Sequence, residues 1–272
     1  MTAPARSRAE PDIADELAFS LEIAARAGRL LMERYERVEQ VDYKSARDVV
    51  TEVDHLSEAL ILEAIRRAWP GDGILAEESG EHAGSASGAQ RGRTWVVDPL
   101  DGTINYANGI PVFCVSIGLV AGGRPLVGVV HDPTRLETFS AVVGGPARLD
   151  GRPITASDKE RLSDFVVSMA LGGRSVATRA RNVRKAIRVS RSMGSAALAL
   201  AYVANGRFDA FVQQGGLSAW DVAAAGLIAE RAGATVTDLA GGPWFDLARP
   251  PRSIGVLAAP RTHHGALLEL VR

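Results

Sequence analysis

The sequence predicts a mixed α/β protein, on three observations. Hydrophobic residues make up 46% of the 272-residue chain, which is enough to bury a large core. Segments with helical spacing alternate with short β-branched runs that end at glycine, proline or aspartate. The chain has no internal repeat and no low-complexity segment. We therefore expect helices that cover sheets in layers.

The first half begins with helices and is then dominated by strands. Residues 1–11 lack an apolar run and are expected to form a flexible tail. Helical spacing extends from Leu17 to Leu31 and from His55 to Trp69, with a loop and short strand expected at Lys44–Val53 between them. Strands are predicted at Gly73–Ala76, Thr94–Val97, Phe113–Val120, Pro125–His131 and Glu137–Val143.

The Leu149-Asp150-Gly151-Arg152 sequence predicts a hairpin turn near the middle of the chain. We place the lobe boundary there, with an N-terminal α+β lobe at 12–148 and a C-terminal α/β lobe at 149–272. In the second lobe, helices are predicted at Ala177–Val189, Ser195–Ala204 and Ala219–Ala232 and from Pro260 onward. Strands are predicted at Phe165–Met169, Arg207–Gln213, Ala234–Asp238 and Ser253–Ala258.

Charge and cysteine content exclude several classes of protein. The 31 lysines and arginines nearly balance the 32 aspartates and glutamates, so no global field attracts nucleic acid or an anionic membrane. The single cysteine, Cys114, excludes internal disulfides and cysteine-rich zinc sites. No leader and no long apolar span is found, and we expect a cytoplasmic protein without nucleic-acid or membrane partners. The basic residues between Arg174 and Arg191 are interpreted as a solvated helix face, although so many arginines could also favour a more acidic or a bisphosphorylated substrate.

Residues 95–106, Trp-Val-Val-Asp-Pro-Leu-Asp-Gly-Thr-Ile-Asn-Tyr, carry the strongest functional signal. An apolar strand runs directly into Asp98 and Asp101, and buried carboxylates need a countercharge. With the Leu100 carbonyl they form a set of hard oxygen donors, which suits Mg²⁺, Mn²⁺ or Ca²⁺ better than zinc. Gly102 and Thr103 are predicted to start a short helix whose free amides can receive an anion. An Asx-Pro turn before a capped helix would explain Asp101 and Thr103, but not Asp98.

Three further acidic motifs are scattered along the chain. Asp54 is predicted to be the N-cap of the second helix, Glu77 and Glu78 end a strand, and Asp221 begins an alanine-rich helix. Each has a structural explanation by itself: a helix cap, a solvated loop, or an acid favoured by the helix dipole. Explaining all of them in this way at once is harder, which favours a shared site.

Taken together, these motifs resemble the inositol monophosphatase superfamily of Mg²⁺-dependent, lithium-sensitive phosphatases. The resemblance spans residues 44–240, in the family's order and approximate spacing. The segments that carry it are Asp48–Asp54, Gly73–Glu78, Trp95–Tyr106, Gly194–Ala197 and Trp220–Ala224. It implies a layered α-β-α-β-α sandwich of the sugar phosphatase type and a homodimer.

The resemblance also implies roles for individual residues. Glu77, Asp98 and the Leu100 carbonyl would bind one Mg²⁺, and Asp98, Asp101 and Asp221 a second; some relatives bind a third. Catalysis would use Thr103, held by Asp54, together with Glu77. Substrate contacts would come from Leu100, Asp101, Gly102, Thr103, Gly194, Ser195, Gln214 and Asp221.

Substrate choice is less determined than the chemistry. Gln214 stands seven positions before Asp221, where the family usually has a glutamate that contacts inositol hydroxyls. A neutral amide lacks the stronger charge-assisted acceptor. Inositol 1-phosphate is the first substrate expected, and histidinol phosphate, fructose 1,6-bisphosphate and 3′-phosphoadenosine 5′-phosphate are alternatives. A metal- or phosphate-binding regulatory protein without catalysis is a further alternative from another class.

Overall fold

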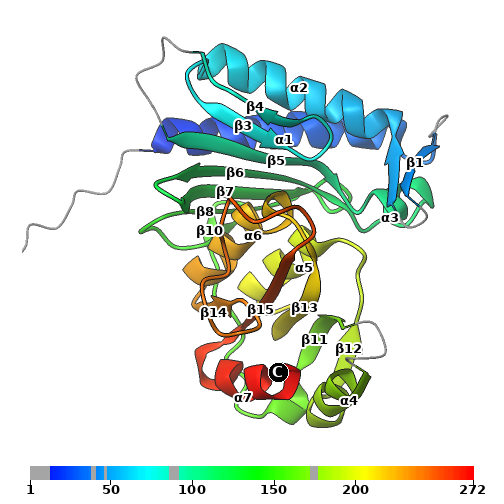
Figure 1. Ribbon diagram of the computed structural model, residues 1–272, viewed down its shortest axis with the longest axis vertical. Coiled ribbons are helices and arrows are strands. Elements are labelled where there is room, and N and C mark those ends of the chain that lie inside the picture. The colour runs from blue at the N-terminus through cyan, green and yellow to red at the C-terminus, as the bar shows by residue number, and fades with distance from the viewer. Residues whose placement is uncertain (1–12, 38–40, 46–47, 86–91, 172–176) are drawn as a thin grey trace, which may run out of the picture.

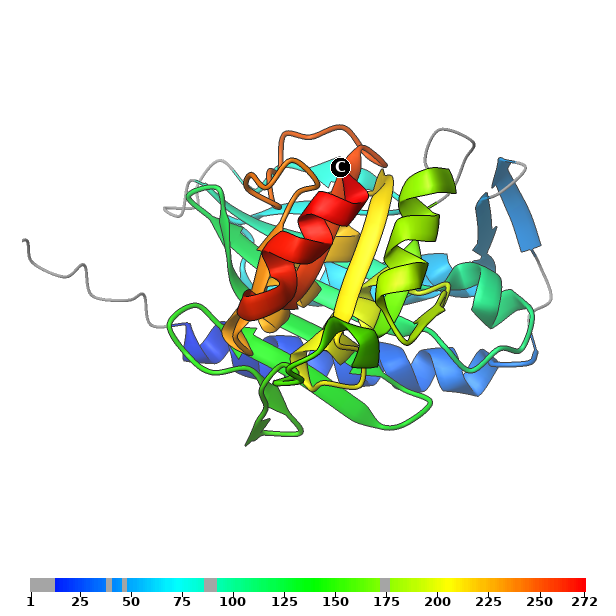
Figure 2. The ribbon, with the colours of Figure 1, turned by 90° about the horizontal axis from the view of Figure 1, so that it is seen from below.

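The computed structural model describes residues 13–37, 41–45, 48–85, 92–171 and 177–272. Its elements stack in α-β-α-β-α layers (Figure 1), so the predicted fold class is confirmed. The outer helices α1 (Ala14–Arg34) and α2 (Glu52–Ala68) cover the first sheet. Helices α5 (Ala196–Ala204) and α6 (Ala219–Arg231) form the middle layer. Figure 2 shows α4 (Ala177–Ala186) and α7 (Arg261–Val271) over the second sheet.

The first sheet has eight strands in the order β10-β9-β8-β7-β6-β5-β3-β4. Its pairs are antiparallel except β3 with β5. The strands are β3 (Gly73–Ala76), β4 (Gly80–His82), β5 (Arg93–Asp101), β6 (Cys114–Ala121), β7 (Arg124–Asp132), β8 (Glu137–Val142), β9 (Arg148–Leu149) and β10 (Arg152–Pro153). A separate hairpin joins β1 (Val41–Ser45) to β2 (Asp48–Thr51).

The second sheet has five strands in the order β12-β11-β13-β15-β14. Strand β11 is parallel to both β12 and β13, whereas β15 is antiparallel to both of its neighbours. The strands are β11 (Val166–Ala170), β12 (Val189–Arg191), β13 (Ala210–Leu217), β14 (Ala234–Thr237) and β15 (Ile254–Pro260). Two short helices, α3 (Thr103–Ala107) and η1 (Leu162–Asp164), complete the described elements.

Several short strands were not predicted, among them β4 and β12. Strand β4 follows Glu78 and pairs with β3, and the basic helix ends at Ala186 so that β12 can pair with β11. Three-residue edge strands have too few positions to show alternation, so their pairing depends on the neighbouring strand. The predicted hairpin turn is present, with Asp150 at φ 49° and Gly151 at φ 76°. Strands β9 and β10 around it still belong to the first sheet, and the division into lobes at 148/149 stays a prediction. The predicted tail at 1–11 and Arg174 lie outside the described residues.

Close packing of small residues sets the position of α6 on the first sheet. A Cβ atom at Gly128 of β7 would lie 2.6 Å from the carbonyl oxygen of Ala224, and one at Gly118 of β6 would lie 3.1 Å from Ala223 Cβ. The helix therefore rests directly on the strands, with its alanines buried. This contact brings the first turn of α6, with Asp221, to the end of β5.

Among the described residues, none of the helices combines the length and hydropathy that crossing a bilayer requires.

Candidate metal centre and active site

Three aspartates from distant parts of the chain meet where β5 ends. Asp98 and Asp101 flank a break in the register between β5 and β6, and Asp221 lies in the first turn of α6. One carboxylate oxygen from each lies within 4.8 Å of the other two. Asp98 is 1% exposed and Asp101 is 8% exposed, so these charges are held away from bulk water.

The surroundings of this cluster disfavour charged carboxylates. Burial raises the pKa of Asp98 well above its usual value, and repulsion from Glu77, Asp101 and Asp221 raises it further. Burial, followed by repulsion from Asp101, raises the pKa of Asp221 to about 7. One oxygen of Asp98, Oδ2, is buried and has no hydrogen-bond partner among the described residues. A divalent cation among these hard oxygen donors would supply both the countercharge and the missing partner, so the residues fit a metal.

Glu77 and Leu100 lie beside the three aspartates. The Glu77 amide donates to the Val97 carbonyl at 3.1 Å, which extends the pairing of β3 with β5, and its carboxyl is near enough to raise the pKa of Asp98. The Leu100 amide donates to Asp98 Oδ1 at 3.0 Å, and its carbonyl accepts from Thr103 Oγ1 at 3.0 Å. A carbonyl has a second lone pair, so this bond is compatible with the predicted ligand role.

Asp54 joins α2 to the predicted catalytic threonine. The prediction that Asp54 is the N-cap was wrong, because the N-cap is Thr51 and Asp54 stands three residues later in a capping box. Asp54 Oδ2 accepts from Thr51 N at 2.8 Å and from Thr51 Oγ1 at 2.6 Å. Its other oxygen, Oδ1, accepts from Thr103 Oγ1 at 2.9 Å. One buried carboxylate thus caps the helix and holds Thr103, so a structural role of Asp54 at the helix end is compatible with a role beside Thr103.

Asp101 is held by the N-terminal end of α5. Its carboxylate accepts from Ser195 Oγ at 2.5 Å, from the amides of Ala197 at 2.7 Å and Ala196 at 3.1 Å, and from Cys114 Sγ at 3.7 Å. Burial raises the pKa of Asp101, and the bonds from Ser195 and the α5 amides partly offset that effect. The Ser195 hydroxyl, predicted to contact substrate, therefore points at a candidate metal ligand.

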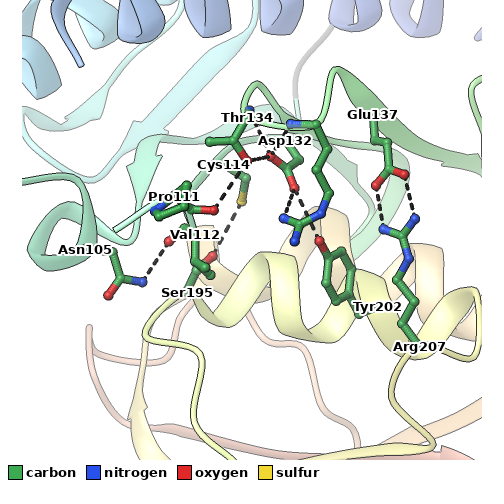
Figure 3. Close-up of polar contacts among 11 residues, drawn as sticks. Asn105, Pro111, Val112, Cys114, Asp132, Thr134, Glu137, Ser195, Tyr202 and Arg207 are labelled. Atoms are coloured by element: carbon green, nitrogen blue, oxygen red, sulfur yellow. Dashed lines mark hydrogen bonds and ion pairs between the residues drawn. The ribbon is translucent and has the colours of Figure 1, made fainter. Parts of the chain in front are cut away.

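Asn105 fixes the segment that carries Gly194 and Ser195. Its side-chain amide donates to the carbonyl of Val112 at 2.7 Å (Figure 3) and to that of Met193 at 2.8 Å. Gly194 has φ 78°, and a Cβ there would lie 2.8 Å from the Asn105 amide, so both backbone and space require glycine. Sequence reasoning assigned no role to Asn105 and used Cys114 only to exclude disulfides and cysteine-rich zinc sites; nothing local in the sequence indicates either contact.

Further along, α5 is tied to the turn between β7 and β8. Buried Asp132 accepts from the hydroxyl of Tyr202 at 3.3 Å and from Thr134, and Arg207 pairs with Glu137 (Figure 3). These contacts hold the C-terminal end of α5 in place, and the amides of its first turn bind Asp101.

Comparison with known proteins agrees with this geometry. A family model for the inositol monophosphatase family matches residues 12–272. The chain belongs to this family.

Relatives within the family carry more than one name. A protein named Nus factor SuhB from Pasteurella multocida is 39% identical over 236 residues, covering 83% of this chain and 86% of the relative. A fructose-1,6-bisphosphatase/inositol-1-monophosphatase from Thermotoga maritima is 37% identical, covering 84% and 86%. The crystal structure of the suhB protein from Bartonella henselae has a TM-score of 0.87 at 34% identity, covering 95% and 99%. The family is metal-dependent and acts on phosphorylated substrates, but these names do not decide one substrate.

One cavity adjoins an acidic motif of the family, and a second cavity is lined by Gln214. One, of about 420 Å³, is lined by Glu77, Glu78, Trp220 and Arg249, among others. Gln214, the candidate substrate residue, is exposed on β13 and lines the other cavity, of about 670 Å³. The structure thus brings the candidate ligands and the Asp54–Thr103 pair together near the end of β5. Gln214 lines a separate cavity.

Proposed function

We propose that the protein is a Mg²⁺-dependent phosphate monoester hydrolase for a small polyol or sugar phosphate, with inositol 1-phosphate as the first candidate. The observation that carries the proposal is the cluster formed by buried Asp98 and Asp101 with half-buried Asp221. After burial, repulsion from Asp101 and Asp221 raises the pKa of Asp98, and among the described residues Asp98 Oδ2 has no hydrogen-bond partner. The proposal includes a homodimer in the cytoplasm, as expected from the resemblance.

The carboxylate and carbonyl oxygens near the end of β5 indicate which residues would hold the cations. Glu77, Asp98 and the Leu100 carbonyl would hold one Mg²⁺, and Asp98, Asp101 and Asp221 another. Bound cations of this kind neutralise phosphate charge and lower the pKa of a coordinated water. Asp98 serves both positions, which fits its place as the most buried member of the cluster.

The chain's own groups would orient the attacking water. The Thr103 hydroxyl lies within hydrogen-bond distance of Asp54 Oδ1 and the Leu100 carbonyl, so its proton is directed toward one of these acceptors. The lone pairs of Thr103 Oγ1 are then left to accept from water. Glu77 would accept the proton that the water loses as it attacks phosphorus in line with the leaving alcohol. No covalent intermediate with the protein is needed.

The Gly102–Thr103 turn would receive the substrate phosphate. Gly102 has φ 102°, and a Cβ there would lie 2.9 Å from the Val112 carbonyl, so a side chain at this position would be strained and crowded. The absence of a side chain leaves the backbone open to close approach by an anion.

A phosphate-release assay tests the proposal. Inositol 1-phosphate, fructose 1,6-bisphosphate, histidinol phosphate and 3′-phosphoadenosine 5′-phosphate should be offered with and without Mg²⁺, and with lithium as an inhibitor. We expect Mg²⁺-dependent release from at least one ester. Release from none of them, in a protein shown to be folded and to bind Mg²⁺, would refute the proposal.

A second candidate is a regulatory role in transcription, because relatives at 38–39% identity are named Nus factor. The observation that favours it is the basic helix α4, which carries Arg179, Arg181, Arg184 and Lys185 and no acidic residue. The near-neutral charge of the whole chain and the intact acidic motifs favour the enzyme. Specific RNA or transcription-factor binding that survives in a chain lacking phosphatase activity would favour the regulatory role.

A further inference from the structure

Helix α2 has polar side chains on its buried face, where most helices have apolar ones. Ser57 and Glu58 follow Asp54 by three and four positions, so the three side chains share one face of the helix. All three are buried, and α2 packs on β5 (Figure 1). Asp54 binds Thr103. The bonds of Ser57 and Glu58 reach two other segments that carry candidate metal ligands.

Ser57 binds the turn that follows Asp98. Its hydroxyl donates to the Pro99 carbonyl at 2.9 Å, across 42 positions of the chain. The amide of Leu100, on the other side of the same peptide unit, donates to Asp98 Oδ1 at 3.0 Å. Because a peptide unit is planar, bonds on both of its sides fix its orientation. Ser57 therefore helps to hold the Asp98 carboxylate and the Leu100 backbone in one arrangement.

Glu58 binds the turn that carries Glu77. Residues 77–79 connect β3 to β4, and Glu58 Oε2 accepts from the Glu78 amide at 2.8 Å. The neighbouring Glu77 amide donates to the Val97 carbonyl of β5 at 3.1 Å. Two consecutive amides of this turn are thus held, one by β5 and the other by α2. The position of the Glu77 carboxyl relative to β5 therefore depends on Glu58.

Folding alone does not explain a glutamate at position 58. Among the described residues, its hydrogen-bond partner is the Glu78 amide, and no arginine or lysine pairs with it. A carboxylate is costly to bury without an opposite charge, and one hydrogen bond from a backbone amide offsets only part of that cost. The segment that Glu58 holds accounts for it better than stability does.

We propose that Ser57 and Glu58 are positioning residues of the candidate metal centre. Together they set the spacing between Glu77 and the Asp98–Leu100 turn. These two segments come from different strands and would supply all the donors of one Mg²⁺, and α2 is bonded to both of them. This inference rests on the proposed function and extends it to residues outside the ligand set.

Calorimetric titration with Mn²⁺ tests the proposal without any substrate. Glu58→Met has a side chain of similar length but no oxygen, and we expect it to weaken Mn²⁺ affinity about tenfold, as when a group that orients a metal ligand is lost. Glu58→Gln keeps an oxygen that can accept from the Glu78 amide, so it should retain more of the affinity than Glu58→Met. Ser57→Ala should weaken affinity about tenfold as well, because the Pro99 carbonyl loses its donor.

The matched control is Ser20→Ala on α1. Ser20 is as buried as Ser57 and also donates to a backbone carbonyl, that of Glu16 at 2.7 Å, but this bond stays within its own helix. Urea unfolding should show a similar loss of stability in the two serine variants. Mn²⁺ affinity should fall in Ser57→Ala and stay at the wild-type level in Ser20→Ala, which a purely structural role of Ser57 would not produce.

The outcomes separate this inference from the proposed function. Wild-type Mn²⁺ affinity in Glu58→Met and Ser57→Ala, or an equal loss in Ser20→Ala, would overturn the positioning role while leaving the phosphatase intact. If Glu58→Met does not fold, the comparison of the two serine variants decides. Weakened Mn²⁺ binding in a protein that hydrolyses none of the esters would support the positioning role and refute the proposed function. A wild-type protein that binds no Mn²⁺ would overturn both.

Discussion

The two ends of strand β5 solve the problem of buried charge in different ways. At its start, Arg93 pairs with Glu16 at 2.8 Å and with Asp72 at 3.1 Å, and the indole of Trp95 donates to the same Asp72 oxygen at 3.0 Å. At its end, Asp98 and Asp101 meet Asp221, and the pKa of Asp98 is raised by other carboxylates. Among the described residues, Arg93 lies between the acids at the start of the strand, whereas at its end Arg252 lowers the pKa of Asp221 only in part.

This difference separates a structural role from a functional one. A cation of the chain beside a buried acid offsets part of the cost of burial: burial raises the pKa of Asp72, and Arg93 and Trp95 lower it again in part. Acids gathered around one another have an unfavourable free energy in the folded chain, so folding alone does not explain them. The end of β5 is therefore where a cation from solution is needed.

The largest expected effect is the loss of activity in Asp98→Asn. Because Asp98 would serve both cations, we expect turnover to fall by more than about 100-fold, the upper end of what losing a group that supports a metal ligand costs. The metal-free variant should be at least as stable as the wild type, since one repelling charge is removed. Phosphate release and thermal unfolding measure the two effects. Near-normal turnover in Asp98→Asn would contradict the assignment.

An Asp→Asn substitution beside the other end of β5, at Asp72, should lower stability and leave activity unchanged. Asp72→Asn leaves Arg93 with one acidic partner, and we expect the free energy of unfolding to fall by about 3 kcal/mol, as for a broken buried ion pair. The kcat of the folded fraction should stay at the wild-type level, because this region lies away from the acidic cluster. Urea unfolding and active-site titration test this. A variant with unchanged stability but lost activity would remove the distinction between the two ends.

Removing the Ser195 hydroxyl should loosen Asp101 without removing any candidate ligand. In Ser195→Ala, the 2.5 Å bond to Asp101 is lost while the α5 amides remain. We expect metal affinity to weaken roughly tenfold, with rescue in Ser195→Thr, which restores a hydroxyl. Calorimetric titration with Mn²⁺ measures this directly. If metal affinity is unchanged and only KM rises, Ser195 contacts substrate as the sequence first suggested.

The sequence predicted the local parts of this site better than the distant ones. The candidate metal ligands in Asp98-Pro99-Leu100-Asp101 could be found from the sequence, because the strand, the turn and the oxygen donors are contiguous. The N-cap of α2 is Thr51 and not Asp54, because Thr and Asp both favour the N-cap position and the sequence alone does not decide between them.

The resemblance predicted the contact between Asp54 and Thr103, but other contacts between distant segments were not predicted. Ser195 meets Asp101 across 94 positions, and Cys114 reaches the same carboxylate from a strand that looks purely apolar. The Glu16–Arg93–Asp72 group was likewise not predicted. Each of these contacts depends on how layers stack, which periodicity does not specify.

The smallest expected effect is a pH dependence of metal binding. Burial and Asp101 raise the pKa of Asp221 to about 7, so at pH 6 a proton competes with the cation for this carboxylate. Apparent affinity for Mg²⁺ should increase roughly tenfold between pH 6 and pH 8. The stability of the metal-free protein should change with pH in the opposite direction.

The folded state binds the Asp221 proton more tightly than the unfolded state does. The stability that this proton contributes is therefore present below about pH 4 and is lost as the pH rises through 7. Unfolding with and without Mg²⁺ across this range measures both trends. Asp221→Asn should flatten them, and an unaltered pH profile in that variant would assign the titration to another group.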